Sequence, residues 1–295
     1  MDRRVFLAGT AASCFAQDDA TFRSDVKVVS ILANVLDKQG RLIRDLGKED
    51  FQVLENGKPQ EIKYFSRDVD LPLTLGILID TSMSQAGVME AERSACFRFL
   101  DRVLRPKDQA FLMRFDMEIA TPVGLTGDLE KLREALAFID TPTRAELRQQ
   151  RGGGTLLFDS VLMAAKETMA RQQGRKALIV ISDGGENGSD ASLTEAMEAA
   201  QRADTLIFSI LFGGSMGRGN LVRMSRETGG GFFEPDRKTG IDGVFAAIQD
   251  ELRGQYNIGY VSDVPVRVSS FRTLQLTTGR KGLRVQARDK YWAQR

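Results

Sequence analysis

Four predominantly apolar runs constrain the fold of this chain more than any other feature of its sequence. They cover residues 73–79, 110–115, 177–181 and 206–212, and none of them alternates polar with apolar residues. A strand has this composition when helices cover both of its faces, as in a parallel sheet. Amphipathic stretches lie between and after the runs, at residues 88–104, 129–139, 156–169, 193–203, 220–227 and 241–252. This alternation predicts an α/β fold with a doubly wound, mostly parallel sheet.

The two ends of the chain follow the strand period instead. Residues 51–54 and 62–65 read as the arms of a hairpin around an Asn56-Gly57 turn, after a longer strand that begins near residue 26. Strand-like stretches return at residues 256–260, 271–277 and 283–287. Because each group of strands is too small to be stable alone, we expect both ends to join in one small β-sandwich.

These patterns divide the 295 residues into four predicted segments. They are an export signal at residues 1–16, an N-terminal β segment at 17–70, an α/β domain at 71–253 and a C-terminal β segment at 254–295 that completes the sandwich.

Residues 1–16 are predicted to direct export. Arg3 and Arg4 precede a short apolar stretch and resemble the twin-arginine export signal, and Cys14-Phe15-Ala16 fits a cleavage site. A docked N-terminal helix and a lipoprotein signal ending at Cys14 stay open as alternatives. Export would place the protein in the periplasm, outside the cell or in the cell envelope. No other segment is apolar and long enough to predict a membrane span in the mature chain.

The composition excludes several classes of function. The chain has no histidine, so it cannot form a Ser-His-Asp triad, an HExxH motif or a Cys/His zinc site. Its two cysteines, Cys14 and Cys96, provide no disulfide framework, and Cys96 lies on an apolar helical face, where we expect it to be a core residue. The net charge is +1, with both signs scattered along the chain. We therefore expect no nucleic-acid partner.

Oxygen-bearing side chains gather where the apolar runs end. Asp80, Ser82 and Ser84 follow the first run, Asp183 follows the third, and Thr155 comes after three glycines at the start of a helix. In an open parallel sheet, ligands bind beyond the carboxyl ends of the strands. Carboxylates and hydroxyls without histidine or thiolate suit Mg²⁺, Mn²⁺ or Ca²⁺. Each element also has a simpler interpretation: Ser82 and Ser84 as helix caps, and Asp183 as the first residue of a tight turn.

Together, the Asp-x-Ser-x-Ser motif, the distant Gly-Gly-Thr and the Ser-Asp-Gly resemble a von Willebrand factor A (VWA) domain with its metal-ion-dependent adhesion site. The resemblance covers about residues 71–252, and with the flanking β segments the mature chain resembles a family of exported bacterial VWA-related proteins. It implies that Ser82, Ser84 and Thr155 bind the ion through their hydroxyls. It implies that Asp80 and Asp183 act directly or through water.

The resemblance also marks three residues around the site. Met83 stands where glycine is commoner in this family, so we expect its side chain on the rim. Asp116 and Asp159 are candidates for supporting the ligands from behind, and each is equally interpreted as a solvated or capping residue.

The function that this resemblance implies is binding rather than catalysis. Mg²⁺, or Mn²⁺ or Ca²⁺ in its place, would offer an open coordination position to an Asp or Glu of a protein partner. One alternative is a Mg²⁺-dependent phosphohydrolase that forms an aspartyl phosphate on Asp80. That chemistry needs a second Asp two residues later, where this chain has Ser82. The other alternative is a structural module of a cell-envelope assembly whose metal site is silent.

Overall fold

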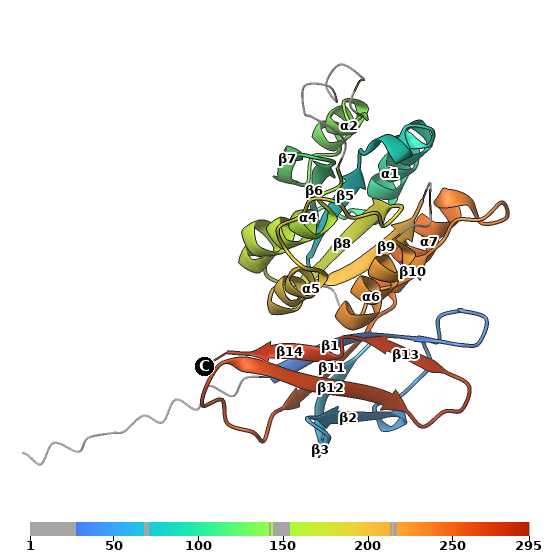
Figure 1. The fold of residues 1–295 in the computed structure, drawn as a ribbon. Coiled ribbons are helices and arrows are strands. Elements are labelled where there is room, and N and C mark those ends of the chain that lie inside the picture. The colour runs from blue at the N-terminus through green and yellow to red at the C-terminus, as the bar shows by residue number, and fades with distance from the viewer. Residues whose placement is uncertain are drawn as a thin grey trace, which may run out of the picture.

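The computed structural model describes residues 28–67, 71–141, 143, 154–212, 214 and 217–294 (Figure 1). The predicted export signal and its cleavage site lie outside the described residues. A larger α/β unit and a smaller β-sandwich lie side by side, and both ends of the described chain belong to the sandwich.

The central sheet of the larger unit has the strand order β10-β9-β8-β5-β6-β7. Neighbouring strands are parallel except for β7, which pairs with β6 in the antiparallel sense. The strands are β5 (Leu73–Asp80), β6 (Gln109–Phe115), β7 (Ile119–Thr126), β8 (Arg175–Ser182), β9 (Leu206–Leu211) and β10 (Phe232–Phe233). Every residue of β5, β8 and β9 is buried, which confirms that their apolar runs are covered on both faces.

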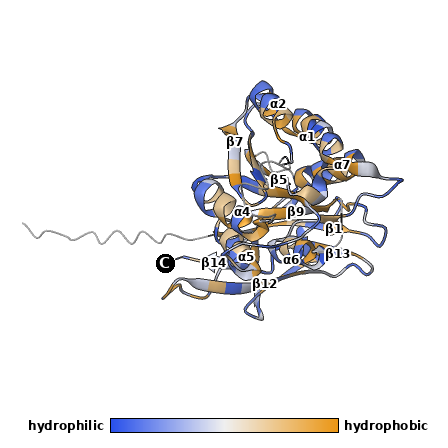
Figure 2. Cartoon of the chain, turned by 45° about the horizontal axis from the view of Figure 1, so that its top comes forward, coloured by the Kyte–Doolittle hydropathy of each residue, from blue (hydrophilic) through white to orange (hydrophobic). Residues whose placement is uncertain are grey.

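Helices cover both faces of this sheet. On one face lie α1 (Met89–Val103), α2 (Leu129–Ala137) and α7 (Gly240–Arg253). On the other lie α4 (Leu157–Met163), α5 (Leu193–Arg202) and α6 (Arg218–Thr228). The central strands are hydrophobic, while the outward turns of the helices are hydrophilic (Figure 2). The prediction of a doubly wound α/β fold is confirmed.

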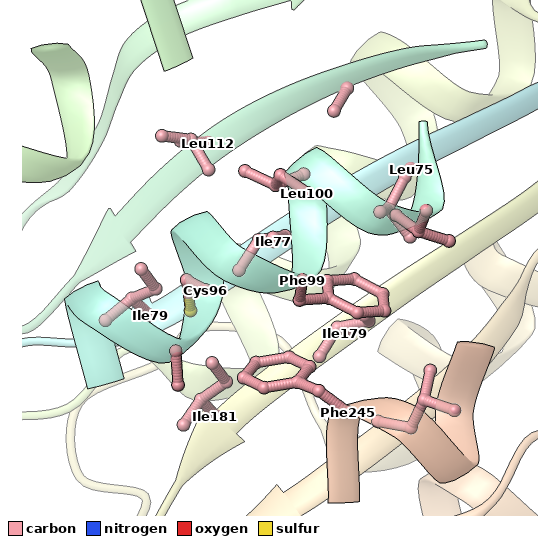
Figure 3. Packing of buried hydrophobic residues seen from close by; sticks show 14 of the residues in the cluster. Leu75, Ile77, Ile79, Cys96, Phe99, Leu100, Leu112, Ile179, Ile181 and Phe245 are labelled. Atoms are coloured by element: carbon pink, nitrogen blue, oxygen red, sulfur yellow. The ribbon is translucent and has the colours of Figure 1, made fainter. Parts of the chain in front are cut away.

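The apolar face of α1 packs as its spacing predicts. Cys96, Phe99 and Leu100 lie over Ile77 and Ile79 of β5 (Figure 3). Phe99 also stacks on Phe245 of α7, with 4.6 Å between ring centroids. Cys96 is fully buried, so its assignment as a small core residue is confirmed.

The sandwich takes strands from both ends of the chain. One sheet has the order β13-β1-β11-β4 and the other β14-β12-β2-β3, and all pairs are antiparallel. The strands are β1 (Val28–Leu36), β2 (Phe51–Glu55), β3 (Lys58–Gln60), β4 (Ile62–Ser66), β11 (Tyr256–Val261), β12 (Ser270–Thr278), β13 (Arg284–Ala287) and β14 (Lys290–Ala293). The predicted union of the two chain ends is confirmed, while the exact segment boundaries stay a prediction.

Two details of the sequence prediction were wrong. The Asn56-Gly57 turn joins β2 to the short β3, with Val53 opposite Gln60, whereas β4 crosses to the other sheet and pairs with β11. The predicted helix at residues 156–169 is α4 followed by a π-helical segment, Ala164–Thr168, and a 3-10 turn, Met169–Arg171. Apolar periodicity does not distinguish these backbone forms, because it reports only which face is buried.

The sandwich contacts the amino-terminal edge of the central sheet. The chain leaves β4 and enters β5 there, and α7 leads into β11 there. Arg175, the first residue of β8, donates hydrogen bonds to the carbonyls of Leu71 and Leu252 at these two connections. α5 and α6 pack against β14 and β13. The carboxyl ends of the parallel strands therefore point away from the sandwich. No helix in the described part of the chain is long and apolar enough to cross a membrane.

Candidate metal site at the carboxyl edge of the sheet

The Asp-x-Ser-x-Ser loop curls around the carboxylate of Asp80, the last residue of β5. Asp80 is fully buried, and its Oδ1 accepts a hydrogen bond of 2.9 Å from the backbone N–H of Ser82. Its Oδ2 accepts one of 2.6 Å from the hydroxyl of Ser182 at the end of β8. The hydroxyl oxygens of Ser82 and Ser84 lie 3.0 Å apart. The spacing of the three residues thus places two hydroxyls together beside a buried carboxylate.

The interpretation of these serines as helix caps is wrong. Ser82 precedes the 3-10 turn Met83–Gln85, but its side chain makes no capping hydrogen bond. The next helix, α1, begins after Val88, which also provides no side-chain cap. The Ser82 and Ser84 hydroxyls bond to one another instead, so capping does not explain their presence.

Asp183 follows β8 and lies in a tightly built loop. It is 4% exposed, and its Oδ1 accepts a hydrogen bond of 2.8 Å from the backbone N–H of Gly185. The tight-turn interpretation therefore accounts for one of its two carboxylate oxygens. A Cβ atom on Gly214 would lie 3.2 Å from Oδ2, so the absence of a side chain at position 214 leaves space beside that oxygen.

Two glycines fix the Asp183 loop against the start of α6. Gly184 has φ +77°, and its carbonyl oxygen would lie 1.4 Å from a Cβ atom on Gly217. Asn220 donates a hydrogen bond of 3.2 Å to that carbonyl. Only glycine permits two backbones to approach this closely. These glycines therefore set the geometry of the loop.

Burial raises the pKa of Asp80, because a desolvated carboxylate is less stable than the neutral acid. Hydrogen bonds from Ser182 and Ser82 oppose the shift, while the negative charge of Asp183 adds to it. The two motif aspartates therefore interact electrostatically, and a cation between the two loops would relieve their repulsion.

Thr155 lies in a loop that pairs with the Asp183 loop. Its backbone N–H and carbonyl exchange hydrogen bonds of 3.0 Å with Asn187. The next residue, Leu156, donates to the carbonyl of Asp116. These bonds fix Thr155 beside the carboxyl edge of the sheet. Its hydroxyl has no hydrogen bond to the Asp80, Ser82, Ser84 or Asp183 side chains within the described residues, so its part in an ion site stays a prediction.

Asp116 and Asp159 support different loops. Asp116 is buried and accepts hydrogen bonds from the Thr81 hydroxyl at 2.7 Å and from Arg114 at 3.1 Å. It therefore braces the Asp-x-Ser-x-Ser loop from behind. The Asp159 carboxylate accepts bonds of 2.9 Å from the backbone N–H groups of Asp190 and Ala191. Asp159 thus fixes the loop before α5, as a capping residue would. Met83 is 45% exposed, and its place on the rim of an ion site stays a prediction.

Sequence reasoning missed two buried polar residues in and after the Asp-x-Ser-x-Ser loop. Glu92, on the first turns of α1, and Gln85 are both fully buried. Both carboxylate oxygens of Glu92 and the Oε1 of Gln85 have no hydrogen-bond partner among the described residues. Burial and the nearby charge of Asp80 raise the pKa of Glu92 to about 8. The available signal was its spacing, since Glu92 shares the apolar face of α1 with Cys96 and Phe99.

The donor set fits a hard divalent cation. No three Asp, Glu, His or Cys side chains of the described residues come close enough to hold an ion. A site here therefore depends on hydroxyl ligands, which Ser82 and Ser84 provide beside Asp80. The Oε1 of Gln85 and both carboxylate oxygens of Glu92 are further oxygens that have no partner among the described residues. Such oxygen ligands suit Mg²⁺, Mn²⁺ and Ca²⁺.

Comparison with known proteins identifies the family. Residues 73–232, more than half of the chain, match the family model of the von Willebrand factor type A domain. This chain belongs to the VWA domain family. The match spans β5 to β10 and includes Asp80, Thr155 and Asp183. The resemblance to a VWA domain is therefore confirmed, while the metal-ion-dependent adhesion site stays a prediction.

Two solved structures of a mussel protein show the same fold, and a third solved structure, that of BatB, aligns less closely. Proximal thread matrix protein 1 from the mussel byssus aligns with a TM-score of 0.53 and 14% identity over 68% of this chain and 51% of that one. Another structure of that protein is described with a zinc-occupied MIDAS (metal-ion-dependent adhesion site) motif. It aligns with a TM-score of 0.52 and 14% identity over 66% of this chain and 48% of that one. BatB from Bacteroides thetaiotaomicron gives a TM-score of 0.48 and 16% identity over 61% of this chain and 97% of that one. A search of curated proteins gives no match.

Proposed function

We propose that this VWA protein is a divalent-cation-dependent protein-binding module and that it has no catalytic step. The ion would be held at the carboxyl edge of the central sheet. It would offer an open coordination position to an Asp or Glu side chain of a protein partner. The proposal joins the family assignment, which covers the fold, to the chemistry of this chain's own side chains.

One observation carries the proposal: the Ser82 and Ser84 hydroxyls lie 3.0 Å apart beside the buried carboxylate of Asp80. Neither serine caps a helix, and the two oxygens share a single hydrogen bond. Burying a carboxylate is costly unless its charge is compensated. A bound cation would compensate Asp80 and Asp183 together, and the hydroxyls would complete its coordination.

Three hydroxyl residues and three aspartates would form and support the ion site. Ser82, Ser84 and Thr155 would bind the ion through their hydroxyl oxygens. Asp80 and Asp183 would act directly or through water, and Asp116 would hold the loop through Thr81. Oxygen ligands favour Mg²⁺, Mn²⁺ or Ca²⁺. Zinc belongs among the ions to test, because the mussel protein of the same fold is described with zinc in its MIDAS motif.

The place of the site in the fold suits the capture of a large partner. The carboxyl edge points away from the sandwich, so the sandwich does not cover it. The exposed side chain of Met83 would provide apolar contact at the rim.

We further propose that residues 1–16 direct export and are removed. The intact mass of the protein from its native cell, compared with that of the full chain, tests this part.

Calorimetric titration of Mg²⁺, Mn²⁺, Ca²⁺ and Zn²⁺ into metal-free protein tests the function. We expect one binding site in the wild type and its loss in Asp80→Asn and Ser84→Ala. A peptide rich in Asp and Glu should then bind only in the presence of the ion. No binding of any of the four ions would overturn the proposal and favour a metal-silent structural module. Turnover of a phosphate ester that Asp80→Asn abolishes would favour the phosphohydrolase.

A further inference from the structure

Glu92 is an unusual buried carboxylate in this protein. It is fully buried on α1, and neither of its carboxylate oxygens has a hydrogen-bond partner among the described residues. Burying such a group without a donor or an opposite charge costs free energy, and native proteins seldom do so.

Two other buried glutamates provide the comparison. Glu55, inside the sandwich, accepts hydrogen bonds from Arg272 at 2.7 Å and from Tyr260 at 2.6 Å. Glu251, on α7, accepts one of 2.6 Å from the side-chain amide of Gln286. Both are thus supplied with donors where the fold buries them. Glu92 is not, so the fold alone does not explain why a carboxylate occupies its position.

The surroundings of Glu92 connect it to the candidate metal site. Its position on α1 follows the Asp-x-Ser-x-Ser loop closely in sequence, and the charge of Asp80 acts on it. On the next turn of α1 its neighbour is the apolar thiol of Cys96. Gln85 lies between the loop and the helix, and its Oε1 is likewise buried without a partner. Three acceptor oxygens without donors among the described residues thus lie on Gln85, next to Ser84, and on Glu92, eight residues after Ser84.

We infer that Glu92 is a positioning residue that strengthens divalent-cation binding through its negative charge, at a cost to the stability of the metal-free protein. The inference rests on the proposed metal site and adds a residue outside its motifs. Glu92 is not a direct ligand here, because no three acidic side chains of the described part come close enough to share an ion. A cation held by Asp80 and the two serines would favour the ionised form of Glu92 and would be favoured by it.

The test compares Glu92→Gln with Glu90→Gln, a matched control. Gln keeps the shape of the side chain and removes its charge. Glu90 lies two residues earlier on the same helix, and its side chain is exposed. Its substitution by Gln makes the same change in net charge as Glu92→Gln. Mg²⁺ is titrated calorimetrically into each protein at pH 8.5, and the Tm of each metal-free protein is measured. Glu92→Met, which removes every polar atom of the side chain, provides a second variant.

We expect Glu92→Gln to weaken the Kd for Mg²⁺ about 10-fold and to raise the Tm of the metal-free protein by about 2 °C or more. Glu92→Met should act in the same direction, and Glu90→Gln should change neither quantity. A merely structural role predicts the opposite change in Tm.

The outcomes separate this inference from the proposed function. Mg²⁺ binding by the wild type with an unchanged Kd in Glu92→Gln would overturn the inference and leave the metal site intact. A lowered Tm in both Glu92 variants, or an equal loss of affinity in Glu90→Gln, would also overturn it. No cation binding by the wild type would overturn both proposals.

Discussion

The hydroxyl of Ser182 donates a hydrogen bond of 2.6 Å to the Oδ2 atom of Asp80 and joins two motifs that lie 102 residues apart in sequence. The parallel pairing of β5 with β8 produces this contact, because Ile79 lies opposite Ile181 and the next residue of each strand is Asp80 or Ser182. The Ser182 oxygen also accepts a bond of 2.9 Å from the N–H of Gly184. Ser182 thus couples the Asp-x-Ser-x-Ser loop to the Asp183 loop.

Ser182→Ala should destabilise the protein by about 1–3 kcal/mol, because it leaves an oxygen of the buried Asp80 carboxylate without a donor. Urea denaturation of the metal-free protein measures this change. Ser84→Ala is the control, since Ser84 lies on the exposed side of the same loop. It should leave the free energy of unfolding nearly unchanged while it abolishes metal binding. Equal stabilities for the two variants would contradict the role of Ser182.

Gly217→Ala should strongly destabilise the protein, because the new Cβ atom would lie 1.4 Å from the carbonyl oxygen of Gly184. Gly219→Ala is a close control in the first turn of α6, where a Cβ atom has nothing within 4 Å. It should be neutral or stabilising, by up to about 1 kcal/mol, since Ala favours the helix. Thermal denaturation of both variants distinguishes them. A stable Gly217→Ala protein would show that the two loops can move apart.

The pKa of Glu251 predicts a pH dependence of stability. Burial raises this pKa from 4.5 to about 7, although a hydrogen bond from Gln286 acts to lower it. Because the folded state holds the proton more tightly than the unfolded state, the resulting stability is fully present below pH 4.5 and is lost as the pH rises through 7. Glu251→Gln removes this loss. The variant should therefore gain stability over the wild type at pH 8 relative to pH 4.5.

Chemical denaturation at the two pH values measures that gain. Glu92 has a pKa shift of the same direction. Glu92 is present in both the wild type and the variant, so the difference in stability between these two proteins reports Glu251. An equal difference in stability at pH 4.5 and pH 8 would contradict the shift.

Arg272→Met should destabilise the sandwich by about 3–5 kcal/mol, because it leaves the fully buried Glu55 without its cation. Arg280→Met provides the control. Arg280 also pairs with carboxylates, those of Asp45 and Asp50, but on the exposed surface, and its loss should change stability much less. Guanidinium denaturation of the two variants gives the comparison. A similar change in both would mean that the Glu55 network provides no stability beyond that of a surface ion pair.

The sequence predicts most of the fold because burial on two faces leaves a clear apolar pattern. The predominantly apolar runs that form β5, β8 and β9 needed no other signal. Two strands that we did not predict, β7 and β10, lack this apolar pattern. β7 contains Pro122 and Gly124 and pairs with β6 in an irregular register, and β10 has only two residues. The crossing of β4 to the second sheet was missed because a turn signal shows where a chain reverses and does not show which strand receives it.

For the candidate site, the strand ends could be predicted but the supporting residues could not. Asp80, Ser82 and Asp183 follow apolar runs, so their places at one edge of the sheet could be read from the sequence. Ser182 was part of a motif but gained its role only through strand register. Glu92 has the spacing of the apolar face of α1, but spacing alone does not show that the carboxylate is buried without a partner among the described residues.

A crystal structure of the protein soaked in Mn²⁺, with anomalous scattering recorded from the metal, tests the central claim most directly. We predict one anomalous peak at the carboxyl edge of the central sheet. It should lie about 2.0–2.6 Å from the hydroxyl oxygens of Ser82 and Ser84, beside Asp80. The absence of a peak there, or a peak only elsewhere on the protein, would contradict the account.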